Sequence, residues 1–108
     1  MSSAKYNIYR AEATAAAGAS TPPLVIPPRA AVITAAVHPN VGGTAIVYYT
    51  LDDADDVLAN PGAARWVAWE AASVSASTVK AFAGPVVAVK ADATAAPCTL
   101  QICVSFDR

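Results

Sequence analysis

The sequence predicts an all-β fold, an antiparallel β-sandwich or jelly roll of about seven to eight strands. Short segments in which apolar and polar residues alternate recur along the chain. Eight prolines and five glycines separate these segments. Although 27 of the 108 residues are alanine, which favours helix, no apolar stripe with helical period extends beyond about two turns. The length fits a single domain with one core.

Residues 1–29 are expected to form an N-terminal strand and an extended, proline-rich arm, ahead of a β-sandwich core over residues 30–108. The strand is expected at residues 6–13. A helix over residues 11–19 is an alternative, which Gly18 and the lack of amphipathic pattern weaken. Residues 21–28 read T-P-P-L-V-I-P-P, and their prolines fix an extended path and remove amide donors. This proline-rich segment is predicted either as an edge strand of its own sandwich or as an arm on a neighbouring subunit.

The core strands are expected at residues 29–37, 44–51, 65–71, 77–83, 85–92 and 99–107. Alternation is clearest in the last, where Leu100, Ile102, Val104 and Phe106 share one face. The strand at 44–51, with Leu51 on its apolar face, is half apolar on the other face too, so both faces are expected to be covered. One helical turn is expected between Asp52 and Asn60, with Asp55 as its N-cap.

The composition predicts a surface poor in charge. Only 14% of the residues are charged and 56% are apolar, whereas an average soluble domain has about 25% charged residues. The net charge is −1 and the lysines and arginines are scattered, which argues against nucleic-acid binding. No apolar run reaches the roughly 18 residues of a membrane span, and residues 1–10 lack a secretory signal. We therefore expect a cytoplasmic product whose surface is buried against other proteins.

Residue patterns for catalysis or metal binding are weak. The single histidine, His38, lies in a His-Pro-Asn sequence and is expected in an exposed turn. Cys98 and Cys103 have odd spacing, so on one strand they face opposite sides and are expected to be free thiols. The acidic run 52–56 lacks EF-hand spacing and is expected to be a solvated loop, with a calcium site as the alternative. No glycine-rich phosphate loop is present. The sequence therefore predicts no catalytic residue, cofactor or metal.

The aromatic residues suggest both core and surface roles. Trp66 and Trp69 are three residues apart, so on a strand one should enter the core and the other should face the surface or an interface. The tyrosines either anchor the core or join a surface platform for stacking on sugars; they are Tyr6, Tyr9, Tyr48 and Tyr49. The candidate interface residues are Pro22, Pro23, Leu24, Val25, Ile26, Pro27, Pro28, Trp66 and Trp69.

The order of segments between residues 44 and 106 adds a further indication. T-A-I-V-Y-Y-T at 44–50 leads into an acidic stretch that ends in N-P-G at 60–62. W-V-A-W at 66–69, a Ser/Thr-rich span at 73–78 and G-P-V-V-A-V-K-A at 84–91 follow, before an alternating last strand. This order resembles the small β-sandwich virion proteins of tailed bacteriophages, which decorate heads or build tail parts. Lys90 stands where arginine is common in that group.

The resemblance implies a structural role without enzyme activity. It suggests a capsid decoration or cement subunit in contact with the major capsid protein or other virion proteins, or a tail or baseplate component. It also implies a homo-oligomer, with a trimer as one symmetric arrangement, located in the virion and assembled in the host cytoplasm. Trp66, Trp69 and the tyrosines leave a carbohydrate-binding host-attachment module as the alternative.

Overall fold

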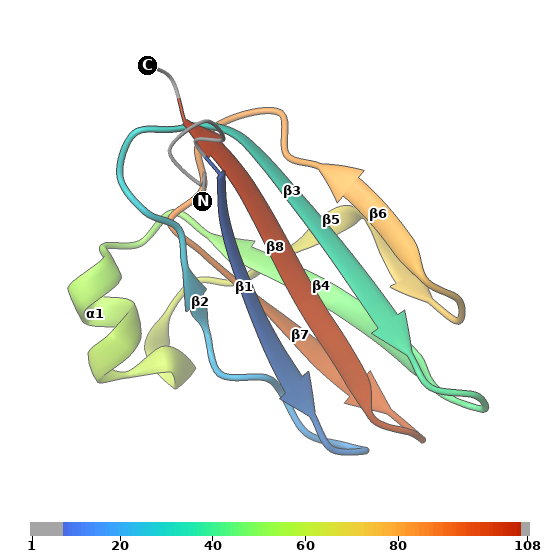
Figure 1. The fold of residues 1–108 in the computed structure, drawn as a ribbon. Coiled ribbons are helices and arrows are strands. Elements are labelled where there is room, and N and C mark those ends of the chain that lie inside the picture. Colours follow the sequence, from blue (N-terminus) through green and yellow to red (C-terminus); the bar gives the residue numbers. More distant parts are fainter. Residues whose placement is uncertain (1–7, 107–108) are drawn as a thin grey trace.

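The computed structural model describes residues 8–106, which form two four-stranded antiparallel sheets in two layers (Figure 1). The first sheet has the order β1-β8-β3-β6 and the second the order β2-β7-β4-β5. This interleaved order is that of a jelly roll, and the predicted all-β sandwich is confirmed. The strands are β1 (Ile8–Ala15), β2 (Leu24–Val25), β3 (Ala30–Pro39), β4 (Thr44–Thr50), β5 (Val67–Val74), β6 (Thr78–Ala81), β7 (Ala88–Thr94) and β8 (Cys98–Phe106).

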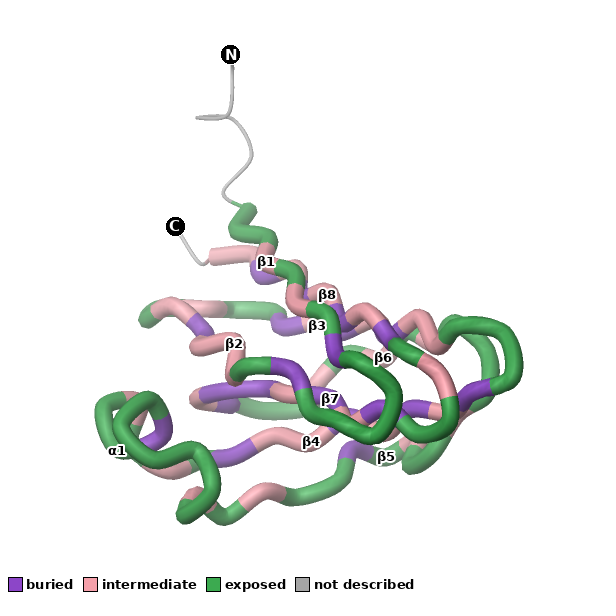
Figure 2. The backbone as a smooth tube through the Cα atoms, turned by 90° about the horizontal axis from the view of Figure 1, so that it is seen from below, coloured by how far each residue is buried: buried purple, intermediate pink, exposed green. Residues whose placement is uncertain are grey.

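The core lies between the two sheets and is built from alternate residues of the strands (Figure 2). Leu100, Ile102 and Val104 of β8 are buried, as their alternation predicts. Many facing positions are alanine, such as Ala35 and Ala91, which are fully buried. Because alanine fills little volume, the few large side chains must fill the rest of the core at native packing density.

The two strands that the structure describes before residue 30, β1 and β2, belong to the sandwich. β1 pairs with β8 along its whole length, from Ile8 opposite Ser105 to Ala15 opposite Cys98. The alternative helix over residues 11–19 is therefore wrong, because pairing with β8 satisfies the backbone of β1 and buries Ala15. β2 pairs with β7, so the proline-rich segment contains an edge strand of the protein's own second sheet. Residues 6 and 7 of the predicted first strand lie outside the described residues.

A short helix, α1 (Ala54–Ala59), covers one end of the second sheet and is followed by a 3-10 turn at Pro61–Ala63 (Figure 1). Asp53 is its N-cap, not Asp55 as expected, because the Asp53 carboxylate accepts a hydrogen bond from the Asp55 amide at 3.2 Å. Val57 of α1 and Thr50 are fully buried outside the main core cluster. Leu51, expected on the inner face, lies beyond the end of β4 and is 66% exposed.

Other strand boundaries differ from the predictions by a few residues. β5 continues to Val74 because its register with β4 shifts between Ile46 and Tyr48. The extra residues of β5 are accommodated by a bulge in which Ala72 has a positive φ of 56°. β7 begins only at Ala88. The prediction of two covered faces for β4 holds at Thr50, the only outward residue of that strand that is buried.

None of the helices in residues 8–106 is long and apolar enough to cross a membrane.

Candidate functional site

The proline-rich segment is fixed by hydrogen bonds at both of its ends, to β7 and to Val87, the residue that precedes β7. The Thr21 amide donates to the Ala91 carbonyl at 2.8 Å, and the Ala91 amide donates to Oγ1 of Thr21 at 3.0 Å. At the other end, the Ile26 amide donates to the Val87 carbonyl at 2.8 Å. Thr21 and Ile26 are buried, whereas Pro22 is exposed. The segment is therefore held on its own sandwich, and only its outward side is available to another molecule.

A groove of about 660 Å³ runs along the second half of this segment. Its walls are residues 25–30, the start of α1 and the loop at 85–87. Val25, Ile26, Pro27 and Pro28 all line it, with Asp53 as one of its few charged groups. Leu51, Pro85 and Val86 also line a second groove of about 300 Å³. We call the surface around the three apolar residues that line both grooves, Leu51, Pro85 and Val86, the apolar end.

Trp66 and Trp69 lie at the other edge of the second sheet and face opposite ways. Trp69 is 3% exposed in the core, and its Nε1 donates to the Ala72 carbonyl at 2.7 Å. Trp66 is half-buried, and its Nε1 donates to the Pro61 carbonyl at 2.9 Å. The prediction of one core and one surface tryptophan is confirmed. Because β7 and β4 separate β2 from β5, the structure does not bring the tryptophans to the proline-rich segment.

Trp66 instead forms a cluster with Tyr48 and Lys90 on the outer face of the second sheet. The Lys90 Nζ lies 5.2 Å from the centre of the Trp66 ring and 5.3 Å from that of Tyr48, within the range of a cation–π interaction. Asp92 lies 3.5 Å from the same nitrogen and accepts a hydrogen bond from Ser20. We call Tyr48, Trp66 and Lys90 the aromatic–lysine cluster. The role of Lys90 was missed because it depends on the register between β4 and β7.

The tyrosines do not form one platform. Tyr9 lies on β1 in the first sheet. Tyr49 faces the inner side and packs edge-on against Phe82, with 5.3 Å between ring centres. Only Tyr48 joins Trp66, and Tyr6 lies outside the described residues. A sugar-stacking surface would therefore rest on Trp66 and Tyr48.

The acidic run takes part in local structure around α1. Arg65 donates to the Asp52 carboxylate from its amide at 2.8 Å and from its guanidinium at 3.0 Å. These hydrogen bonds, the backbone one first, lower the pKa of Asp52. Asp55 and Asp56 lie in the first turn of α1, where their negative charges interact favourably with the positive end of the helix dipole. Within residues 8–106, no three His, Cys, Asp or Glu side chains gather as metal ligands.

His38 belongs to a row of hydrogen-bonded side chains across the first sheet, not to an exposed turn as expected. It lies in β3, where its Nδ1 is 2.8 Å from Ser77 Oγ and its Nε2 is 2.7 Å from Gln101 Oε1. The Gln101 Nε2 in turn donates to Glu12 at 2.7 Å. Since Gln101 Oε1 only accepts, Nε2 of His38 donates to it. In the neutral imidazole, Nδ1 then accepts from the Ser77 hydroxyl.

This row pairs a hydroxyl with a histidine base, as in nucleophilic catalysis. However, the group that orients the imidazole is the neutral amide of Gln101. A neutral amide does not stabilise the imidazolium that forms during base catalysis as a carboxylate does. The row is better suited to cross-linking β1, β8 and β3 to the turn that precedes β6.

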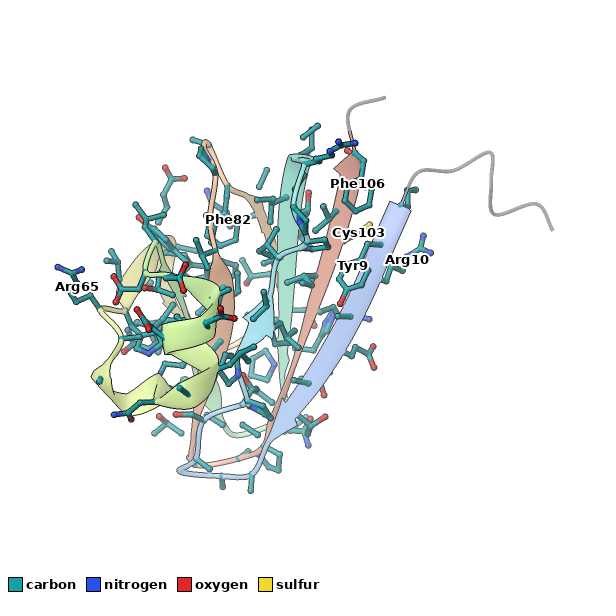
Figure 3. All side chains as sticks on the ribbon, turned by 90° about the vertical axis from the view of Figure 1, so that its left-hand side faces the viewer. Tyr9, Arg10, Arg65, Phe82, Cys103 and Phe106 are labelled. Atoms are coloured by element: carbon teal, nitrogen blue, oxygen red, sulfur yellow. The ribbon has the colours of Figure 1, made fainter. Side chains whose placement is uncertain are left out.

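The two cysteines lie on opposite faces of β8 and are both free, as predicted. Cys98 is buried, and burial raises the pKa of its thiol, with a smaller contribution from the charge of Asp92. Cys103 is half-buried on the outer face, between Arg10 of β1 and Thr34 of β3 (Figure 3).

Comparison with known proteins extends only to the fold. No protein-family model and no curated protein matches the sequence. An oxalate oxidase structure is similar, with a TM-score of 0.55 and 15% identity over 93% of this chain. The chain spans only 42% of that protein's length. A structure of the disulfide-linked pili that form Bacillus endospore appendages has a TM-score of 0.44 and 13% identity, over 94% of this chain and 91% of the other.

Proposed function

We propose that the protein is a non-enzymatic structural subunit of a tailed-bacteriophage virion, a capsid decoration or cement protein. The apolar end is the observation that carries this proposal. Leu51 there is 66% exposed, and Leu58 of the adjoining helix is 58% exposed. Two grooves share Leu51, Pro85 and Val86 as lining residues. Burial of such a surface against a neighbouring subunit removes apolar area from water, which stabilises the assembly.

The sequence and the fold support the same proposal to different degrees. The segment order over residues 44–106 resembles small phage virion proteins. The jelly roll recurs in viral capsids, but also in lectins and cupins, so the fold alone does not select a function. Few charges and only three ion pairs among the described residues fit a protein that other virion proteins surround. A tail or baseplate position would use the same surface.

Purified particles, made with and without this chain, test the proposal by mass spectrometry and cryo-electron microscopy. We expect the chain in wild-type particles, as repeated density whose apolar end faces the major capsid protein. Replacement of Leu51 by Lys should lower its occupancy. Val41→Lys is the matched control, because Val41 is fully exposed near the opposite end of β4. Absence of the chain from purified particles would overturn the proposal, and density on the tail would select the tail alternative.

A carbohydrate-binding host-attachment module is the second candidate, and the aromatic–lysine cluster favours it. Aromatic rings present apolar faces on which sugar rings stack, and neighbouring charged groups can bind hydroxyls. Tyr48 and Trp66 are half-buried with Lys90 over them. A glycan array with the wild-type chain and Trp66→Ala tests this candidate. Binding that Trp66→Ala abolishes would support it, and no binding by the wild type would remove it.

A further inference from the structure

The four edge strands differ in how well they are protected from pairing with another chain. β2 has only two residues and lies between prolines, and β6 has only four residues. β5 contains a register shift and Ala72 at φ 56°. Short length, proline and bulges are the features by which sheet edges avoid pairing with other strands. Three of the four edges therefore have such protection.

The fourth edge, β1, has none of these features (Figure 1). Its eight residues pair with β8 in unbroken register, and they include no proline, glycine or positive φ. Among residues 8–106, no strand lies along the outer side of β1. The backbone amides and carbonyls on that side therefore form a template for an added strand.

The charges on β1 are self-complementary. Arg10 and Glu12 are two residues apart and so lie on the same face of the strand. In an antiparallel pair of β1 strands centred on Ala11, Arg10 faces Glu12 of the second copy, and the reverse contact forms by symmetry. If β1 carried charges of one sign only, the two copies of the strand would place like charges opposite each other and repel. The hydrogen bond from Gln101 to Oε2 of Glu12 holds this carboxylate in place and leaves Oε1 for an incoming guanidinium.

We propose that β1 pairs with β1 of a second copy of this chain, in the register centred on Ala11, so that two first sheets become one continuous sheet. The pairing brings Ile8 opposite Thr14 and Tyr9 opposite Ala13, which covers two apolar side chains that are 45% and 39% exposed. Figure 3 shows Tyr9 and Arg10 on this edge strand. The proposal deepens the proposed structural function, because it names the contact between copies.

Two paired strands bury less than the roughly 800 Å² per partner of a standard interface. The dimer is therefore reversible, and the test measures its dissociation constant. Sedimentation equilibrium of the full chain over a concentration series should show a monomer–dimer equilibrium. Arg10→Glu places like charges opposite each other twice and should raise the dissociation constant about tenfold or more. Glu12→Arg should do the same, and the double variant Arg10→Glu/Glu12→Arg should restore dimerisation because the charges are complementary again.

Lys80→Glu is the matched control. It changes the net charge by the same amount as Arg10→Glu, but it lies on β6, the opposite edge of the same sheet. It should leave the dissociation constant unchanged. Thermal melts of each variant separate loss of pairing from loss of folding. Because the double variant also lacks the contact between Glu12 and Gln101, recovery of its dimerisation would show that charge complementarity, and not that contact, controls pairing.

A wild-type chain that stays monomeric at every concentration would overturn the pairing. So would an oligomer that is insensitive to the single swaps, or a double variant that fails to recover. Each of these three results leaves the virion proposal intact, because that proposal is judged by the presence of the chain in particles. Conversely, a β1 dimer formed by a chain that is absent from particles would support the pairing alone.

Discussion

The Lys90 ammonium nitrogen lies 5.2 Å from the centre of the Trp66 ring. Lys90 is on β7, whereas Trp66 directly precedes β5, and these two strands are not neighbours in their sheet. β4 lies between them and contributes Tyr48, whose ring centre is 5.3 Å from the same nitrogen. One side chain thus connects three segments of the outer face.

Replacement of Lys90 by Met tests this relationship. The variant keeps the length of the side chain and removes its charge, so the cation–π contacts and the contact with Asp92 are lost together. We expect a loss of about 0.5–1 kcal/mol in the free energy of unfolding, measured by urea denaturation. Lys80→Met, at a surface ion pair with Glu70, is the control and should lose less. Equal losses would argue against a role for the rings.

Leu100→Ala tests the position of the core. Leu100 is fully buried between the sheets, so the variant loses transfer free energy and leaves a cavity. We expect a destabilisation of about 2–5 kcal/mol by chemical denaturation. Val41→Ala, at a fully exposed position, should change stability by less than about 0.5 kcal/mol. A small effect at Leu100 would contradict the assignment of its face of β8 to the core.

The sequence predicts the type and faces of strands better than their partners. Alternation assigns Leu100 and Ile102 to the core without reference to any other strand, and the structure agrees. The partner of β8 at the edge is β1, which is distant in sequence. Nothing local distinguishes that pairing from a hairpin with the preceding strand, since register in a jelly roll is set by long-range contacts.

Local sequence patterns gave a wrong prediction where pairing between distant strands determines the structure. His38 and Pro39 have the composition of a turn, yet β3 continues to Pro39, which lies opposite Cys98. The row that connects His38 to Gln101 and Glu12 follows from that continuation. The spacing of Trp66 and Trp69 was sufficient to predict opposite faces, but the approach of Lys90 to Trp66 required the order of strands in the sheet.

Gly43→Ala tests the contact between the turn before β4 and the loop before β8. A Cβ on Gly43 would lie 2.6 Å from the Ala96 Cβ and 2.9 Å from the Ala96 amide nitrogen, so backbone must move. We expect a destabilisation of about 1–3 kcal/mol in thermal or urea unfolding. Gly84→Ala is the control, because a Cβ there meets no atom within 4 Å. Equal stability of the two variants would contradict this close approach.

The contact between Asp52 and Arg65 should make stability depend on pH. The hydrogen bonds from Arg65 lower the pKa of Asp52 in the folded state, so the unfolded chain binds a proton first as the pH falls. The contribution of this contact is therefore complete above the unfolded pKa of about 4, and it is lost as the pH falls through the lower folded pKa.

Asp52→Asn should accordingly be less stable than the wild type at pH 7, and the difference should shrink steadily below about pH 4. Urea denaturation of both proteins across this range measures it. Asp56→Asn is the control, because it removes only the weaker interaction of an exposed carboxylate with the dipole of α1, and its stability difference should vary less with pH. A difference between Asp52→Asn and the wild type that is the same at pH 7 and pH 3 would rule out the ionised contact.

The two thiols should differ in their rates of alkylation. The thiolate is the reactive form, and burial both raises the pKa of Cys98 and blocks access to it. In Cys103→Ser we therefore expect alkylation of the remaining Cys98 only as the protein unfolds, with a rate that rises with urea. In Cys98→Ser, the half-buried Cys103 should react in the folded state. Iodoacetamide labelling followed by mass spectrometry gives both rates, and fast labelling of Cys98 in the native protein would mean that this end of β8 opens frequently.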